Sequence, residues 1–229
     1  MTDPRDSGTR PGVLSLDVRS LVLSEVPILG AISLEVRQSE TVALVGPSGI
    51  GKTSILRIIA GLEHRHKGSC EVSGTVAMVF QEPTLLPWRT AIQNITIAAG
   101  VSLDEAQLAL EEVGLGSRAE DVPGQLSLGQ QRRLSLARAF AARPSLLLMD
   151  EPFVSLDPEL VDEMMGLFAK LRAAHQVTTI LVTHVREEAE KLASRIVSLD
   201  GSPARIVQDA QNTGAYFQLS ASGVTSSRS

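Results

Sequence analysis

The sequence has 229 residues, with 21 Lys and Arg against 26 Asp and Glu, and so a formal net charge of −5 at neutral pH. This acidic balance argues against a protein that binds nucleic acid through a large basic face, and an apolar content of 43% excludes a mainly disordered chain. The length is typical of one large domain, or of one core that carries an inserted subdomain.

Cysteine content and targeting signals indicate the cellular compartment and the relation to the membrane. The single cysteine, Cys70, excludes an intramolecular disulfide and fits a reducing compartment. Residues 1–12 are polar, lack the apolar stretch of a secretion signal and are expected to form a loose tail. No run approaches the roughly 18 apolar residues of a transmembrane helix, so we expect any membrane role to depend on a partner.

Strand and helix patterns alternate along most of the chain. Apolar runs and alternation predict strands at 13–18, 31–36, 41–45, 75–80, 145–150, 177–184 and 195–199. Helical periodicity predicts helices from Lys52 to Gly61, through most of 90–142, over 158–174 and over 186–193. The alternation favours a mainly parallel α/β core, and the helical block at 90–142 is expected to be an insertion in it. The polar end from Ser220 is expected to be disordered.

A glycine-rich segment between a predicted strand and a predicted helix matches the pattern G-x-x-x-x-G-K-[ST]. Its glycines let successive N–H groups surround a phosphate, and the helix N-terminus adds partial positive charge. Lysine can reach the β and γ phosphates and threonine can bind Mg²⁺. The alternative is an ordinary glycine-rich turn. The expected nucleotide-binding residues are Gly46, Pro47, Ser48, Gly49, Ile50, Gly51, Lys52, Thr53 and Ser54.

Four polar residues follow predicted strands of the same core. Asp150 and Glu151 end the apolar run LLLMDEP, Gln81 follows the strand at 75–80, and His184 follows the strand at 177–183. Because the carboxyl ends of parallel strands meet at one edge of a sheet, these side chains should lie beside the phosphate loop. Asp150 could then hold hydrated Mg²⁺, and Glu151 could take a proton from the attacking water. A solvated turn is the alternative for the two acids.

The order of the motifs resembles the ATP-binding subunit of an ABC transporter. The motifs GPSGIGKTS, FQEP, LSLGQQRR, LLLMDEP, SLD and THV occur within residues 13–205, and LSLGQ resembles the family signature LSGGQ. The resemblance implies a P-loop NTPase core with a mainly parallel sheet, an N-terminal antiparallel β subdomain and an α-helical subdomain inserted at about 85–142. Residues 206–229 would form a short C-terminal extension.

The same resemblance implies a head-to-tail dimer, with itself or a homologous subunit, that holds two ATP molecules and Mg²⁺ at its interface. Glu151 would be the general base, His184 would contact the γ phosphate, and Gln81 would bond to Mg²⁺ or the water. Asp157 would communicate across the dimer. The signature residues, which would act on the ATP of the other subunit, are Ser127, Leu128, Gly129 and Gln130.

The resemblance implies that the membrane subunit docks on the loop after Gln81. Leu85, Leu86 and Trp88 would offer it an apolar patch, although Trp88 could instead belong to the core of the helical subdomain. The segment FQEPTLLPWRT is most similar to that of subunits serving importers of sulfonates, taurine, nitrate and related small solutes. We therefore expect a peripheral subunit on the cytoplasmic face of the cell membrane, with a permease, a solute-binding protein in the complex and no nucleic acid.

Several features depart from the family pattern. Leu128 replaces a glycine, Thr53-Ser54 inverts the usual order, and the stretch from Lys52 to Gln81 is short, which predicts trimmed β hairpins. The family stacks an aromatic ring on adenine at a position that corresponds to Leu23, and no aromatic residue precedes Phe80. Adenine would then rest on an aliphatic surface, with a predicted loss of about 1 to 3 kcal/mol.

Two further sequence patterns have structural interpretations, and two other functions fit the motifs. HRHK at 64–67 is interpreted as a solvated turn, and four arginines near the signature are interpreted as solvated or paired with acids: Arg132, Arg133, Arg138 and Arg143. A soluble ABC-type ATPase unconnected with transport is one alternative function. The other, motivated by Leu128, is a hydrolysis-poor ATP-binding partner in an asymmetric pair.

Overall fold

Alternating apolar residues near the start of the chain build an antiparallel sheet. The computed structural model describes residues 12–212, and its first sheet contains β1 (Gly12–Leu23), β2 (Val26–Leu29), β3 (Ile32–Arg37) and β5 (His66–Val72). Strand β1 pairs antiparallel with each of the other three. Leu14, Leu16 and Val18 face the core from β1, while the residues between them are exposed, which is the pattern of a sheet with one wet face.

The second sheet carries the residues of the predicted nucleotide site. Its strand order is β10-β9-β4-β8-β7-β6, and every neighbouring pair is parallel except β10 with β9. The bounds are β4 (Thr41–Val45), β6 (Val76–Val79), β7 (Leu146–Asp150), β8 (Thr178–Thr183), β9 (Arg195–Asp200) and β10 (Arg205–Gln211). Because β4, β8 and β7 lie at the centre of the sheet, the loops that follow them meet at its carboxyl edge.

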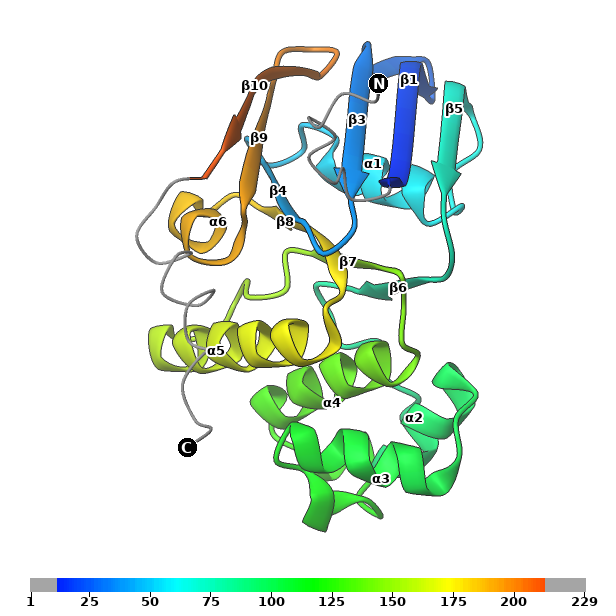
Figure 1. The fold of residues 1–229 in the computed structure, drawn as a ribbon, viewed down its shortest axis with the longest axis vertical. Helices are drawn as coiled ribbons and strands as arrows, with labels where there is room; N and C mark the ends of the chain where they lie inside the picture. The colour runs from blue at the N-terminus through cyan, green and yellow to red at the C-terminus, as the bar shows by residue number, and fades with distance from the viewer. Residues whose placement is uncertain (1–11, 213–229) are drawn as a thin grey trace, which may run out of the picture.

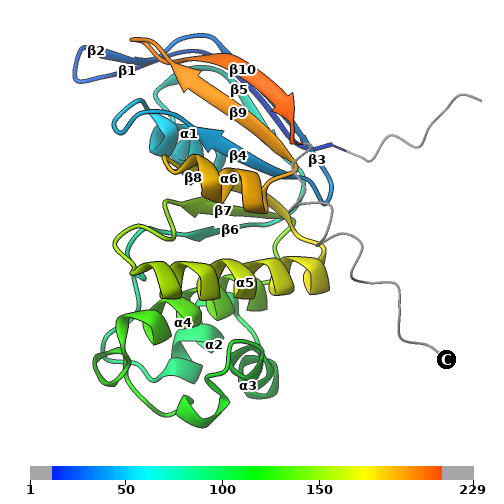
Figure 2. The same cartoon turned by 90° about the vertical axis from the view of Figure 1, so that its left-hand side faces the viewer.

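Helices cover this sheet and form a subdomain of their own. The helices are α1 (Lys52–Ile59), α2 (Ala91–Ala99), α3 (Leu103–Glu112), α4 (Leu128–Ala141), α5 (Pro158–His175) and α6 (Arg186–Leu192), with 3-10 turns at Gly116–Arg118 and Pro123–Gln125. Figure 1 shows α2, α3 and α4 grouped at the opposite end of the molecule from β1, β3 and β5, and Figure 2 shows the same separation from the side. Capping boxes at Thr90, Ser102 and Ser127 fix where α2, α3 and α4 begin.

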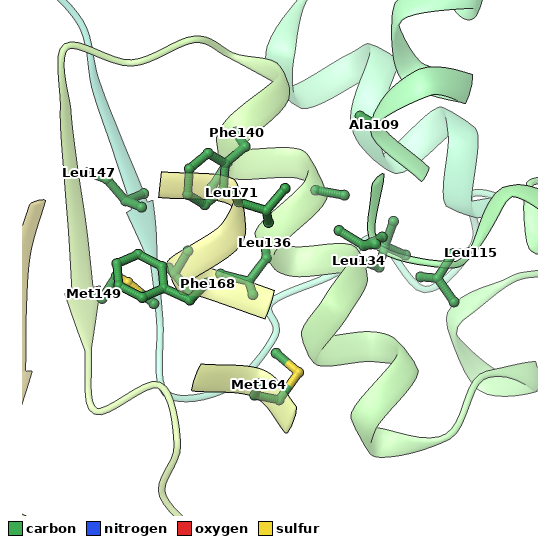
Figure 3. Packing of buried hydrophobic residues seen from close by; sticks show 14 of the residues in the cluster. Ala109, Leu115, Leu134, Leu136, Phe140, Leu147, Met149, Met164, Phe168 and Leu171 are labelled. Atoms are coloured by element: carbon green, nitrogen blue, oxygen red, sulfur yellow. The ribbon is translucent and has the colours of Figure 1, made fainter. Parts of the chain in front are cut away.

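Strand β7 is apolar from Leu146 to Met149 because both of its faces are buried. Leu146 and Leu148 face one hydrophobic cluster, shared with α1 and the antiparallel sheet, whereas Leu147 and Met149 face another, shared with α4 and α5. Figure 3 shows the second cluster, in which the rings of Phe140 and Phe168 lie between β7 and the helices. A strand buried on both faces has no position for a polar side chain until its carboxyl end.

The predicted architecture is confirmed, with differences at the sheet edges. The mainly parallel core, the antiparallel N-terminal sheet and the helical insertion are all present. Strands β2, β5 and β10 were not predicted, and residues 206–211 belong to the core sheet rather than to a separate extension. The interpretation of 64–67 as a turn is wrong for His66 and Lys67, which begin β5. The predictions for 1–11 and 220–229 concern residues outside the described range.

Candidate nucleotide site

The glycine-rich loop joins β4 to α1 under tight steric limits. Gly46 and Gly51 have φ angles of 157° and 111°. A Cβ on Gly46 would lie 2.7 Å from the carbonyl oxygen of Leu199, and one on Gly51 would lie 2.7 Å from a methyl of Leu29. Glycine is therefore required at both positions, because a side chain would collide with the neighbouring strands.

Lys52 begins α1 and is 4% exposed. Its Nζ donates to the carbonyl oxygens of Gly46 at 2.8 Å and Pro47 at 2.9 Å, and it lies 3.9 Å from Oε1 of Glu151. Burial lowers the pKa of Lys52, while the carboxylates of Glu151 and Asp150 act in the opposite direction. The ammonium group is thus held within the loop, where the anionic oxygens of a polyphosphate could replace its neutral carbonyl partners.

Thr53 and Asp150 are joined directly. The Thr53 hydroxyl donates to Oδ1 of Asp150 over 3.0 Å, which links the start of α1 to the end of β7. Asp150 is 8% exposed, and burial raises the pKa of its carboxyl group, against the lowering effect of the Thr53 hydrogen bond. A hydroxyl and a carboxylate side by side are hard oxygen donors of the kind that Mg²⁺ prefers.

Glu151 lies next to this pair and faces His184. Oε2 of Glu151 is 3.2 Å from Nδ1 of His184, and the backbone N–H of Glu151 donates to Val182 of β8. Glu151 adopts a left-handed backbone with φ of 46°, an uncommon conformation for a residue other than glycine. Such conformations persist where surrounding contacts enforce them and cluster at functional sites.

Gln81 belongs to the same edge of the sheet. Val79 of β6 is paired with Met149 of β7, so Gln81 and Glu151 each lie two residues beyond a paired position. Strand β6 ends at Val79, one residue earlier than predicted, and Gln81 is exposed. The predicted convergence of the phosphate loop, Asp150, Glu151 and His184 is therefore present, with Gln81 at its rim.

The signature residues lie apart from this edge, at the N-terminus of α4. Ser127 caps the helix: its Oγ accepts from the N–H of Gln130, whose side chain accepts from the N–H of Ser127. The helix begins at Leu128, whose side chain is 47% exposed. These residues share a surface cavity of about 450 Å³ with Asp157, whose carboxylate caps α5 by accepting from Leu160.

The loop at 81–90 presents Trp88 to solvent. Trp88 is 72% exposed, which excludes its assignment to the core of the helical subdomain. Its loop is nonetheless held in shape by the buried Asn94, which accepts from the N–H of Leu86 at 2.7 Å and donates to the Leu86 and Arg89 carbonyls. An exposed apolar ring on a fixed loop is typical of a contact surface.

Sequence reasoning missed a hollow beside the glycine-rich loop. A groove of about 840 Å³ is lined by Pro47, Ser48 and His184 together with residues of α6, β9 and β10, among them Arg186, Ser198 and Gln208. The lining residues of α6, β9 and β10 belong to no motif, and β10 was not predicted. Leu23 does not line this groove; it ends β1 and packs, partly buried, against the cluster that contains Leu21 and Leu29.

Two of the four arginines near the signature have partners other than those predicted. Arg133 pairs with Glu163 and Arg143 with Glu105, as expected for surface charges. Arg132 and Arg138 instead donate to backbone carbonyl oxygens, and Arg132 is only 7% exposed. The expectation that all four are solvated or paired with acids is therefore wrong for these two.

The fold and the carboxyl-edge cluster together define a P-loop ATPase. A model of the family described as "ABC transporter" matches residues 29–154, more than half of the chain. An aliphatic sulfonates import ATP-binding protein, SsuB 2 of Rhizobium johnstonii, is 42% identical over 90% of this chain and 84% of its own. One of the same name from Frankia alni is 45% identical over 75% of this chain and 71% of its own.

Solved structures agree with the sequence relatives. The ATP-binding cassette MJ0796, in a dimeric post-hydrolysis state bound to ADP and phosphate, is 26% identical, with a TM-score of 0.76 over 89% of this chain and all of that one. A metal-chelate type ABC transporter, at 20% identity, shares the fold with a TM-score of 0.78 over 88% of this chain and 84% of its own. The chain belongs to the ABC transporter family and is one of its ATPase subunits. Across residues 12–212, no helix has the length and apolarity needed to cross a membrane.

Proposed function

We propose that this ATPase drives the import of a small solute, of the class formed by sulfonates, taurine and nitrate. The observation that best supports ATP hydrolysis is the contact of Glu151 with His184, next to the hydrogen-bonded pair of Thr53 and Asp150. The names of the sequence relatives, which are aliphatic sulfonate importers, support the solute class. The solute itself would not touch this subunit.

ATP is proposed to bind with its phosphates on the glycine-rich loop. The backbone of residues 46–51 would surround the β and γ phosphates, with Lys52 as the charged contact, Thr53 and Ser54 at the start of α1, and Leu23 beneath adenine. Supporting this are the positive φ angles of Gly49 and Gly51 and the buried position of Lys52. Without an aromatic ring at Leu23, adenine would contribute less to affinity than the phosphates do.

Mg²⁺ is proposed to bind between Thr53, Asp150 and Gln81. The hydroxyl and the carboxylate lie 3.0 Å apart and are hard oxygen donors, so this pair fits the ion; Gln81 at the rim would bind it or the attacking water. When bound, Mg²⁺ would neutralise phosphate charge during the transfer. Asp150 must be ionised for this, against the burial that raises its pKa.

Hydrolysis is proposed to use Glu151 as the general base. One carboxylate oxygen faces His184 and the other faces Lys52 at 3.9 Å, so the group is oriented before any water arrives. A base within hydrogen-bond reach of the attacking water contributes about 10²- to 10⁴-fold to the rate. His184 would hold this carboxylate and contact the γ phosphate.

The complete site is proposed to form between two copies. The signature residues Ser127, Leu128, Gly129 and Gln130 lie on a different part of the surface from residues 46–53, so they could reach a phosphate only in a partner. The N-terminus of α4 would then direct its partial positive charge at that phosphate. Asp157, which lines the same cavity as the signature, would lie at the contact.

The membrane subunit is proposed to dock on residues 81–88. Exposed Trp88, with half-buried Leu85 and Leu86 beside it, forms the apolar surface that such a partner requires, and this exposure favours transport over a soluble ATPase. The chain would then be a peripheral subunit on the cytoplasmic face of the membrane. A solute-binding protein would complete the importer.

A second candidate function follows from Leu128. Its side chain is 47% exposed at the helix end that should approach the partner's nucleotide, where the family has glycine. If this bulk keeps the two copies apart, the chain serves as a hydrolysis-poor ATP-binding partner beside a different, active subunit.

Purification of the full chain from detergent extracts tests the transport assignment. We expect an integral membrane subunit to co-purify, and Trp88→Ala to abolish that association while leaving ATP hydrolysis by the free chain unchanged. Vanadate-sensitive hydrolysis by the complex would support an active subunit. Hydrolysis by a chain with which no membrane subunit co-purifies would favour a soluble ATPase, and binding without hydrolysis would favour the asymmetric pair.

A further inference from the structure

Helix α4 holds the loop that contains the exposed tryptophan. Nη1 of Arg138 donates to the carbonyl oxygen of Thr84 at 2.9 Å, and Nη2 donates to the carbonyl oxygen of Pro83 and the hydroxyl of Thr84, both at 3.1 Å. Three bonds from one planar guanidinium group fix both the position and the orientation of this backbone. We call residues 81–90 the docking loop.

The same helix holds the loop that follows the general base. Nη1 of Arg132 donates to the carbonyl oxygen of Pro152 at 2.8 Å, and Nη2 donates to that of Val154 at 3.1 Å. We call residues 151–157 the catalytic loop, because it begins with Glu151. Burial lowers the pKa of both arginines, yet an arginine in a protein keeps its charge. Each guanidinium group donates to carbonyl oxygens of a loop, and at Arg132 the carboxylate of Glu82 acts against the effect of burial on the pKa.

Both loops contain strained backbone at the point of contact. Thr84 has a φ of 44°, and Glu151 and Ser155 have φ of 46° and 63°. For side-chain-bearing residues, and above all for β-branched threonine, this region is sterically unfavourable and persists only where other contacts enforce it. The arginine bonds lie at or between these residues, so they are among the contacts that hold the strained conformation.

The helix between the two arginines is continuous and firmly packed. Helix α4 runs from Leu128 to Ala141, so Arg132 and Arg138 lie about 9 Å apart along its axis. Between them, Leu134, Leu136 and Ala137 are buried in the core. Figure 3 shows Leu134 and Leu136 of this helix pointing into the cluster. A displacement of one end is therefore carried to the other, because the helix cannot bend without opening its core.

We propose that α4 is a strut that couples the docking loop to the catalytic loop, with Arg138 and Arg132 as positioning residues. The inference rests on the proposed function, in which the docking loop meets the membrane subunit and Glu151 activates water. Its new content is that the coupling inside one subunit runs through the helix that carries the signature. Nucleotide binding beside the catalytic loop should then change the surroundings of the docking loop.

Trp88 supplies the readout, because it is the only tryptophan in the chain and lies in the docking loop. Addition of ATP and Mg²⁺ to the full chain is expected to shift its fluorescence emission. Arg138→Met should lose this shift while retaining ATP affinity and basal hydrolysis. Arg138→Lys, which keeps the charge but not the planar fork, should lose it too. The matched control is Arg143→Met, since Arg143 is 76% exposed on its side chain and pairs with Glu105.

Each outcome is decisive. If Arg138→Met and Arg143→Met both retain the wild-type shift in Trp88 emission, the proposal that α4 is a strut is wrong. It is equally wrong if the wild type hydrolyses ATP with no change in Trp88 emission. Should Arg138→Met fail to fold, as judged by thermal melting, Arg138→Lys carries the same test. A wild type that neither binds nor hydrolyses ATP overturns the proposed function and the strut with it, and so differs from a failure of the strut alone.

Discussion

His184 and Glu151 meet across the carboxyl edge of the sheet, with Nδ1 and Oε2 separated by 3.2 Å. The contact depends on the parallel pairing of β7 with β8, which sets Asp150 opposite Val182 and leaves the next residues of both strands at the same edge. Lys52 faces the other carboxylate oxygen from α1. A base held from two sides loses little orientational freedom on activating a water, which is how preorganisation lowers a barrier.

Leu128→Gly is expected to raise the turnover of ATP, because it removes an exposed side chain from the helix end that approaches the partner's nucleotide. The same change should lower the free energy of unfolding by up to about 1 kcal/mol, since glycine is a poor helix former. Steady-state hydrolysis at several protein concentrations, with urea unfolding, checks both parts. Leu128→Ala serves as an intermediate control. Unchanged or lower turnover in the glycine variant would show that Leu128 does not obstruct the dimer.

Leu23→Tyr is expected to increase the affinity for ATP by about 5- to 150-fold, the equivalent of roughly 1 to 3 kcal/mol of stacking. The wild type should bind ATP weakly as a monomer and discriminate poorly against GTP. Titration with both nucleotides measures the two effects. Val22→Tyr is the matched control, because Val22 is adjacent on β1, is 47% exposed and points to the other face. Equal gains in both variants, or sharp ATP preference in the wild type, would contradict the assignment of Leu23.

Glu188→Gln is expected to stabilise the protein at neutral pH. Glu188 is buried and accepts from the Thr183 hydroxyl at 2.5 Å, and burial raises its pKa above the ordinary value of 4.5. The folded state therefore keeps the proton longer than the unfolded state does. That contribution to stability is complete below pH 4.5 and is lost as the pH rises through the folded pKa.

Glutamine accepts the same hydrogen bond and carries no charge, so the stability difference between Glu188→Gln and wild type should grow from pH 4.5 towards neutral. Urea unfolding of both proteins at several pH values measures it. Glu190→Gln is the control on the same helix, because the Glu190 side chain is 49% exposed and pairs with Arg186. A difference that stays constant with pH, or a wild type that is the more stable at neutral pH, would be the opposite result.

Motif spacing predicted the catalytic edge well because each motif there joins a buried apolar strand to a polar end. The strands and residues that it failed to predict lack such an apolar pattern or a recognisable partner. Strand β5 is polar along most of its length and β10 is mainly exposed, so neither has the apolar pattern by which strands are recognised. Arg132 and Arg138 bind carbonyl oxygens, which every residue carries, and no sequence pattern marks such a partner.

The departures from the family lie where local sequence and assembly make different demands. Leu128 favours the helix that it begins and is expected to hinder the approach of a partner. Leu23 packs against the core and is expected to weaken the contact with adenine. The fold within one chain tolerates both residues, so their cost would appear only when nucleotide and partner are present.

The hydrolysis of ATP by Glu151→Gln tests whether Glu151 is the general base. Glutamine keeps the shape of the side chain but cannot take a proton, so turnover should fall by about 10²-fold or more. Gel filtration of the variant with ATP and Mg²⁺ should show a stable dimer, because binding is retained while the step that separates the copies is lost. A variant that hydrolyses ATP at the wild-type rate would show that Glu151 is not the base, and one that stays monomeric with saturating ATP would show that ATP does not hold two copies together.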